Sequence, residues 1–264
     1  MRTVAEQADG APTDRGKADG VRTDAGQAGG AQLYVHPEWR ESMPWVVQGV
    51  TGSDADMSLF GDTPVGRVIP RWQRLREQLG CHTVVHSRQV HRDTILIHEV
   101  SPDGLVVGPD ADGHITREPG ALLAISVADC VPIYLAAPEA RAVALLHGGW
   151  RGVAAGILER GITLLTSSYP VEASELHVHF GPAICGQCFE VGPEVPEGLG
   201  MDPVDGRSHV DLRALLAARA IEAGVHAARI TVSGFCTRHG GSPFYSHRGG
   251  CAERQIAFLA VRQV

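Results

Sequence analysis

The sequence has few of the features that direct a chain to a membrane or to a nucleic acid. Its first ten residues, MRTVAEQADG, lack the apolar segment of a secretory signal, so we expect a cytoplasmic protein. The longest apolar run, GALLAISVADCVPIYLAAP, is interrupted by Asp129 and Pro132, which argues against a membrane span. A net charge of −7 gives no general attraction to nucleic acids. The net charge is compatible with a local basic pocket that binds an anionic small molecule. The sequence is compatible with both a monomer and a homodimer.

Familiar catalytic motifs are missing as well. The chain contains no GxGxxG, GxxxxGK[ST], HExxH or GxSxG, so dinucleotide-binding, P-loop, zinc-protease and α/β-hydrolase assignments have no motif support. Without a signal, the six cysteines favour reduced thiols or metal ligands over a disulfide scaffold. The pair CGQC (185–188) and CTRH (236–239) has the spacing of a structural zinc site. Because a predicted helix and strand separate the two halves, we expect these four side chains to lie apart.

Composition divides the chain into a tail and a folded part. Residues 1–32 repeat Gly, Ala, Asp and Thr and have few large apolar side chains, which predicts a disordered tail. Residues 33–264 contain no linker, which predicts one α/β domain with a mixed β-sheet flanked by helices. Apolar spacing predicts helices over 67–80, 153–167 and 211–224, the last capped by Asp211. Strands are predicted over 82–87, 94–100, 121–128, 131–137, 142–147, 176–181 and 229–234, while 253–263 fits either a strand or a helix.

Two histidines and a cysteine lie where predicted strands begin or end. His91 stands between two β-rich runs, Cys130 separates two apolar strands, and His147 ends the next strand. Since neighbouring strands are only about 4.8 Å apart, the three side chains can converge on one point. Imidazole and thiolate ligands suit zinc, and a three-ligand site leaves a fourth position open for water or substrate. The same residues permit a metal-free alternative, with Cys130 as nucleophile and His147 as base.

The residues after His147 suggest an anion site beside this cluster. Gly148 and Gly149 let the backbone approach a ligand closely and permit a positive φ. Arg151 lies near the start of the helix predicted over 153–167, where a guanidinium and free N–H groups can bind an anion.

Seven motifs occur in an order that resembles the YfiH/YlmD family, long labelled multicopper polyphenol oxidase or laccase-domain proteins. They are QVH, ADG..T, ADCVPIYL, HGGWRG, GPAI…CFEVG, G.CT and FYSHR, and the resemblance covers roughly residues 40–262. It implies a single α/β domain with a cysteine-hydrolase-like fold and a metal site at His91, Cys130 and His147. It also implies zinc-dependent phosphorolysis of adenosine, inosine, guanosine and methylthioadenosine, with deamination of adenosine.

Within this resemblance we assign further roles. Arg151 and Arg248 are expected to clamp phosphate or the transition state, and Asp129 to orient a ligand or bind substrate. His247 is either an acid/base or a structural hydrogen-bonding group. Substrate contacts are assigned to four positions: Gln89, Gly148, Gly149 and Arg151.

The older label implies a copper enzyme that oxidises phenols. A laccase needs several copper ions held by about ten histidines in repeated HxH pairs, whereas this chain has a single HxH, and one three-ligand site suits zinc better than a redox relay. Copper is therefore the alternative cofactor. The chain also departs from the family pattern beside the first ligand, where Arg92 replaces a usual glycine and can crowd or recharge the pocket.

Overall fold

The computed structural model describes residues 21–23, 31–239 and 241–263. Most of the predicted tail therefore lies outside the described residues, and the domain boundaries stay a prediction. The short strand β1 (Val21–Thr23) pairs with β2 (Leu33–Val35). In the described part of the chain, no helix combines the length and apolarity needed to cross a bilayer.

The strands form two large mixed sheets and a small ribbon. The seven-stranded sheet has the order β1-β2-β3-β15-β8-β4-β6, with β3 (Val46–Thr51), β15 (Gln255–Val261), β8 (Ala121–Val127), β4 (Thr83–Ser87) and β6 (Gly104–Gly108). The six-stranded sheet has the order β14-β11-β9-β10-β7-β5, with β14 (Ile230–Val232), β11 (His177–Phe180), β9 (Val131–Ala137), β10 (Ala142–Gly148), β7 (Gly113–Thr116) and β5 (Ile95–His98). The ribbon pairs β12 (Glu190–Val191) with β13 (Ser208–His209).

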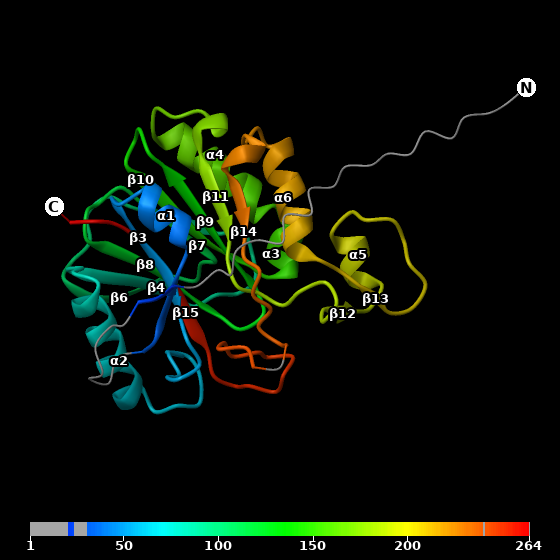
Figure 1. The fold of residues 1–264 in the computed structure, drawn as a ribbon, viewed down its shortest axis with the longest axis horizontal. Helices are drawn as coiled ribbons and strands as arrows, with labels where there is room; N and C mark the ends of the chain where they lie inside the picture. The colour runs from blue at the N-terminus through cyan, green and yellow to red at the C-terminus, as the bar shows by residue number, and fades with distance from the viewer. Residues whose placement is uncertain (1–20, 24–30, 240, 264) are drawn as a thin grey trace, which may run out of the picture.

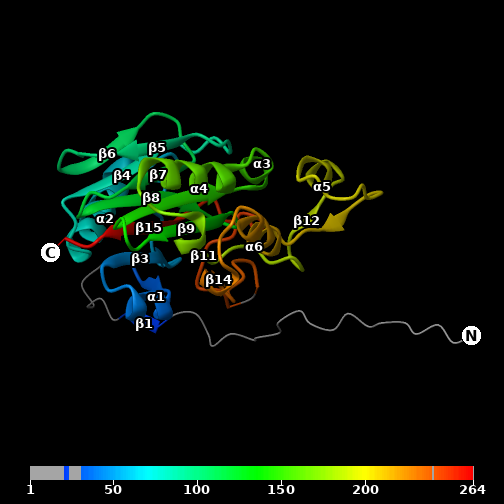
Figure 2. The same ribbon diagram turned by 90° about the horizontal axis from the view of Figure 1, so that it is seen from above.

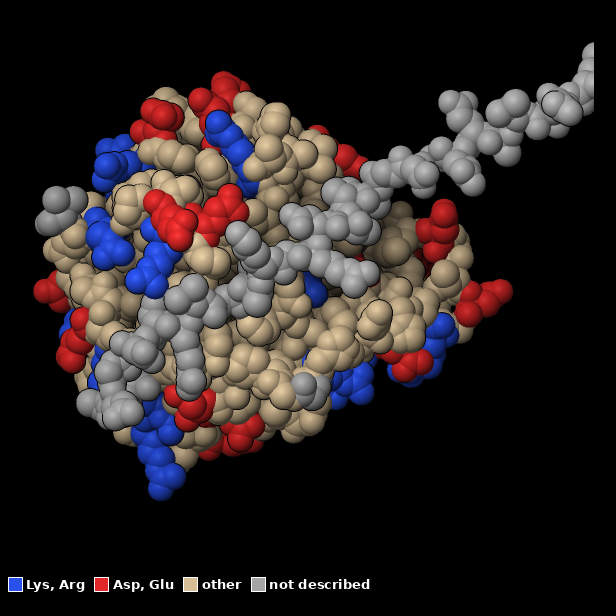
Figure 3. Space-filling view, viewed as in Figure 1, with Lys and Arg blue, Asp and Glu red and all other residues tan. Residues whose placement is uncertain are grey.

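Helices cover the outer faces of the two stacked sheets. In Figure 1, α2 (Val65–Gln78) lies on one side of the strands, and α4 (Ile157–Ser168) and α6 (Leu212–Glu222) lie on the opposite side. Three short helices complete the fold: α1 (Pro37–Ser42), α3 (Trp150–Ala154) and α5 (Glu194–Gly198). Figure 2 shows α5 and β12 standing apart from the main sheets. Acidic and basic side chains are interspersed on the face seen in Figure 3.

Strand β10 shows why its sequence is continuously apolar. Val143 and Leu145 pack in the cluster between the two sheets, while Ala144 and Leu146 pack in the cluster beneath the helices. Both faces of the strand are therefore buried, and alternation between polar and apolar residues is lost. The predicted mixed sheet flanked by helices is confirmed, with the strands divided between two layers.

The local predictions have mixed outcomes. The Asp211 side chain accepts hydrogen bonds from the N–H groups of Arg213 and Ala214, which confirms the predicted cap of α6. The ambiguous C-terminal segment is a strand, β15. The single helix predicted over 153–167 is wrong: the chain forms α3 and α4, separated at Gly156, whose φ of 83° is left-handed. A glycine tolerates that conformation, and it turns the backbone between the two helices.

Candidate metal centre and substrate pockets

The three predicted ligands meet at one end of the six-stranded sheet. β10 runs antiparallel to both β9 and β7, so its last residues lie beside the first residues of those two strands. Cys130 immediately precedes β9, and His147 lies opposite Pro132 in the register of β9 and β10. His91 reaches the same end from the loop before β5. Topology thus brings together residues that are far apart in the sequence.

The ligand atoms of His91, Cys130 and His147 all lie within 4.8 Å of one another. The Cys130 sulfur is 4.0 Å from Nε2 of His91, and the two imidazole rings have centroids 4.8 Å apart. His147 is buried, Cys130 is half-buried and His91 is exposed. The cluster therefore has one open side, as a three-ligand metal site requires, and the binding of a metal there stays a prediction.

Asp112 organises two of these ligands, and the sequence-based assignment missed it. Its Oδ1 lies 2.8 Å from Nδ1 of the His147 ring, which leaves Nε2 of that ring free for a metal. The same carboxylate accepts hydrogen bonds from the backbone N–H groups of Val90, His91 and Arg92. Asp112 is fully buried at the start of β7. Its motif, ADG..T, is part of the family pattern, but only the pairing of β7 with β10 reveals its partner.

One cluster residue, His91, and the residue next to Cys130, Asp129, adopt left-handed backbone conformations. His91 has a φ of 58°, and Asp129, next to Cys130, has a φ of 85°. Such conformations persist where the surroundings hold them in place. At Asp129, Thr237 Oγ1 donates to Oδ1 at 2.6 Å and the Arg248 backbone N–H donates to Oδ2 at 2.7 Å. These hydrogen bonds fix the Asp129 side chain at the turn that presents Cys130, and its role in orienting a ligand or binding substrate stays a prediction.

The absence of a side chain at Gly149 leaves room for the side chains of His91 and Cys130. A Cβ atom at this position would lie 2.7 Å from Cδ2 of His91 and 3.3 Å from the Cys130 sulfur. Gly148 is equally confined, because a Cβ there would lie 2.8 Å from the carbonyl oxygen of Val131. The φ of Gly149 is −73°, so this glycine is required for close approach and not for a positive φ.

Electrostatics in the cluster favour a thiolate at Cys130. Burial by itself would raise the pKa of the Cys130 thiol, but the charge of His147 and hydrogen bonds from His147 and His91 lower it to about 6. Burial would likewise lower the pKa of His147, yet the Cys130 thiolate and Asp112 raise it. A thiolate is both the form that binds zinc and the form that acts as a nucleophile.

Two pockets border this cluster, and His147 lines only the first of them. The first, here called the Gln89 pocket, has a volume of about 300 Å³ and includes Gln89, Phe60, His86 and Arg254. The second, the Arg151 pocket, has a volume of about 310 Å³ and includes Arg151, Arg248, Asp129, Trp150 and Phe189. His91, Cys130 and His247 line both.

The arginines of the Arg151 pocket have guanidinium groups available for an anion. Within the described ranges, no carboxylate forms an ion pair with Arg151 or Arg248. Arg151 stacks on Trp150, with its guanidinium carbon 4.3 Å from the ring centroid. Arg248 stacks on Phe189 at 5.1 Å and donates from Nη1 to the carbonyl of Glu190. Aromatic stacking orients both groups without neutralising them.

Gln89 and Arg92 differ in their relation to the pockets. The Gln89 amide donates to the Ser126 carbonyl at 2.9 Å and accepts from the Ser126 N–H at 2.7 Å. Gln89 thereby ties its loop to β8 while lining the pocket, and its role in substrate binding stays a prediction. The Arg92 side chain is exposed, and Arg92 does not belong to the lining of either pocket.

A second group of donors also comes together, contrary to our expectation. The ligand atoms of four residues lie within 4.8 Å of one another, here called the Cys3His cluster: Cys185, Cys188, Cys236 and His239. The expectation that they lie apart is wrong because β11 and β14 are parallel neighbours. CGQC follows β11 and CTRH follows β14, so both segments begin beyond the C-terminal ends of these two parallel strands.

Comparisons with known proteins agree with the fold and with the motifs. Residues 55–262 match the family described as multi-copper polyphenol oxidoreductase laccase. A purine nucleoside phosphorylase from Xylella fastidiosa (strain Temecula1) is 36% identical over 213 residues, which are 76% of this chain and 80% of that protein. An adenosine deaminase from an unknown prokaryotic organism is 35% identical over 148 residues, covering 52% of this chain and 56% of its own.

The crystal structure of YlmD from Geobacillus stearothermophilus has the same fold. It superposes with a TM-score of 0.78 and 28% identity, and the match covers 92% of this chain and all of YlmD (100%). The architecture implied by the sequence resemblance is thereby confirmed.

Proposed function

Because the chain belongs to the family described as multi-copper polyphenol oxidoreductase laccase, the YfiH/YlmD family, we propose that it is a zinc-dependent purine nucleoside phosphorylase that also deaminates adenosine. The observation that carries the proposal is that the His91, Cys130 and His147 cluster borders two pockets: His91 and Cys130 line both, and His147 lines the Gln89 pocket. The Arg151 pocket contains two guanidinium groups, those of Arg151 and Arg248, that have no carboxylate partner among the described residues and are suited to binding an anionic co-substrate.

The donors of the cluster fit zinc. His91, Cys130 and His147 supply two imidazoles and a thiolate on one side, and Asp112 holds His147 in the tautomer that leaves Nε2 free. A zinc ion held by these three ligands supplies a Lewis acid with an open coordination position. Among the described residues only two groups of three or more such donors assemble, whereas a multicopper oxidase needs several copper sites.

In phosphorolysis, a phosphate oxygen forms a bond to C1′ of the ribose while the bond from C1′ to the purine nitrogen breaks. The purine departs with the electron pair and takes up a proton. We assign Arg151 and Arg248 to phosphate binding, because a guanidinium forms bidentate hydrogen bonds with phosphate oxygens. His247 borders both pockets and is assigned to proton delivery to the departing base.

The Gln89 pocket is assigned to the nucleoside. Phe60 and His86 contribute aromatic surface to it, their rings stack at a centroid distance of 5.9 Å, and Gln89 and Arg254 add polar groups. This mixture suits a purine and its ribose. The assignment places the two substrates in separate pockets that both border His91 and Cys130.

One observation favours a second chemistry for the same residues. The lowered pKa of Cys130, together with the raised pKa of His147, describes a thiolate–imidazolium pair that can act without metal as a hydrolase. Chelation separates the two functions: a zinc enzyme loses activity when zinc is removed and regains it when zinc returns. A cysteine hydrolase keeps its activity on chelation and loses it on alkylation of Cys130.

The direct test is product analysis with purified protein. Incubation with adenosine and phosphate is expected to give adenine and ribose 1-phosphate, and omission of phosphate should abolish adenine release. Inosine formation without phosphate measures the deaminase activity. Oxygen uptake on phenols without any nucleoside conversion would instead establish the copper oxidase.

A further inference from the structure

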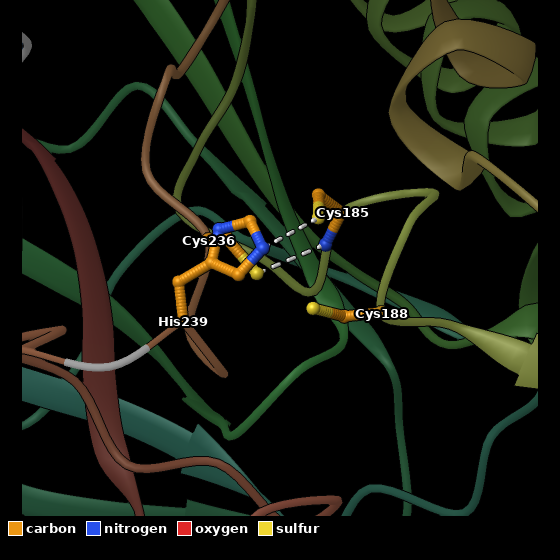
Figure 4. Close-up of side chains that lie close together, drawn as sticks. All are labelled: Cys185, Cys188, Cys236 and His239. Atoms are coloured by element: carbon orange, nitrogen blue, oxygen red, sulfur yellow. Dashed lines mark hydrogen bonds between the residues drawn. The ribbon is translucent and has the colours of Figure 1, made fainter.

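The Cys3His cluster lies outside the proposed catalytic centre and joins two loops. Figure 4 shows its four side chains pointing toward one another, with Cys185 and Cys188 on one segment and Cys236 and His239 on the other. The Cys185 sulfur is 3.9 Å from Nε2 of His239, and the Cys185 N–H donates to the Cys236 sulfur at 3.4 Å. All three cysteines are free thiols. We propose that this cluster binds a structural zinc ion, independently of the proposed function.

The spacing of the donors fits a tetrahedral ion. Zinc–sulfur bonds of about 2.3 Å place two sulfurs of a tetrahedral site roughly 3.8 Å apart. All ligand atoms of the cluster lie within 4.8 Å of one another, so no pair needs to close by more than about 1 Å. Three thiolates and one imidazole complete the coordination shell, which leaves no position for substrate and identifies the site as structural.

The surrounding backbone is arranged as in a metal-binding turn. The Cys185 carbonyl accepts hydrogen bonds from the N–H groups of Cys188 and Phe189, so CGQC forms a tight turn that directs both sulfurs to one side. The opposite segment is fixed by the bridge between Ala183 and Cys236. Arg238 donates to the Cys188 carbonyl at 3.0 Å and brings positive charge to a site that would hold three thiolates. His239 is exposed, which gives zinc an entry path.

A zinc ion bound by the Cys3His cluster would also stabilise the turn that carries Cys130 in the catalytic centre. Ile184, next to Cys185, donates its N–H to the Asp129 carbonyl at 3.0 Å. Thr237, next to Cys236, donates its hydroxyl to the Asp129 carboxylate at 2.6 Å. Ile184 and Thr237, two of the hydrogen-bond partners of Asp129, thus flank proposed zinc ligands. The ion would hold the left-handed turn that presents Cys130, and Cys188 would likewise fix Phe189, the residue on which Arg248 stacks.

The test is zinc stoichiometry and thermal unfolding of the full chain. We expect Cys188→Ser and His239→Ala each to contain one zinc ion fewer per chain than wild type, with the melting temperature lowered by roughly 5 °C. Cys81→Ser is the matched control: this half-buried thiol lies outside both clusters, and the variant should keep the zinc content of wild type. His239→Ala removes an exposed side chain, so it stays informative if Cys188→Ser does not fold.

Cobalt substitution in a His147→Ala background separates this site from the catalytic one. Cobalt bound by the Cys3His cluster should give an intense sulfur-to-metal charge-transfer absorption, which Cys188→Ser then weakens. One zinc per wild-type chain, with stoichiometry and melting temperature unchanged in Cys188→Ser and His239→Ala, would overturn the proposal. A disulfide between two of the three cysteines in protein alkylated at lysis would overturn it equally. Neither result would bear on phosphorolysis.

Discussion

The Oδ1 atom of Asp112 lies 2.8 Å from Nδ1 of His147, and the same carboxylate accepts the backbone N–H of His91 at 2.9 Å. The buried Asp112 side chain therefore fixes the tautomer of His147 and also the conformation of the loop that carries His91, the two histidines proposed as ligands. A carboxylate in this position also increases the basicity of the imidazole that binds the metal.

Asp112→Asn should lower zinc affinity at the catalytic site by about 10- to 100-fold. The amide keeps the size of the side chain but loses the charge that favours the required tautomer of His147. Competition with a chromophoric chelator measures this affinity. Asp110→Asn, which alters the exposed partner of Arg88, is the control and should leave it unchanged. Equal zinc affinity in wild type and Asp112→Asn would remove Asp112 from the account.

Gly149→Ala should reduce phosphorolysis by about 100-fold, because a displacement of roughly 1 Å in reacting groups has an effect of that size. The added methyl would lie 2.7 Å from the His91 ring and would push this ligand from the cluster. Gly66→Ala is the matched control, since a Cβ at Gly66 meets nothing within 4 Å. Steady-state kinetics and zinc content report the effect. Retained activity in Gly149→Ala would mean that the cluster does not need this close approach.

Arg151→Ala should raise the KM for phosphate by about 10- to 100-fold, since a hydrogen bond to a charged group contributes on the order of 1.5–3 kcal/mol. The KM for the nucleoside should change much less, because Arg151 lines only the pocket assigned to phosphate. Arg74→Ala, an exposed residue of α2, serves as the control. Equal losses for both substrates would place Arg151 outside phosphate binding.

Acid should destabilise the protein through His86. Burial lowers the pKa of His86 from 6.5 to about 4, so the unfolded chain takes up a proton that the folded chain refuses. The free energy of unfolding therefore falls as the pH drops from 6.5 towards 4. His86→Asn preserves a donor for the Ala124 carbonyl and should lose about 1.4 kcal/mol less stability than wild type between pH 7.5 and 5.5.

Urea denaturation at the two pH values measures this difference. The exposed His209 provides the control, because His209→Asn should show the same loss of stability as wild type. Identical pH dependence in His86→Asn and wild type would show that His86 is not the group responsible.

Much of the candidate site can be predicted from the sequence, because apolar runs show where strands end and the ligands lie at those ends. Cys130 and His147 were predicted at the ends of neighbouring strands, and the structure brings them together with His91. The role of Asp112 depends on the pairing of β7 with β10, which no local pattern encodes. The meeting of Cys185 with Cys236 depends in the same way on the parallel pairing of β11 and β14.

The helical spacing of apolar residues does not show where a helix is interrupted. The residues before and after Gly156 continue one apolar pattern, yet its left-handed φ divides the segment into α3 and α4. The sequence contains the glycine, but a glycine within a helical pattern is usually tolerated, so the break requires the structure.

The central claim is that the zinc held by His91, Cys130 and His147 is required for phosphorolysis. The most direct measurement determines zinc content and release of adenine from adenosine and phosphate, in wild type and in His147→Ala. The account predicts that the variant loses one equivalent of zinc and all phosphate-dependent adenine release while remaining folded. Wild-type rates in a folded His147→Ala variant that lacks this zinc would contradict it.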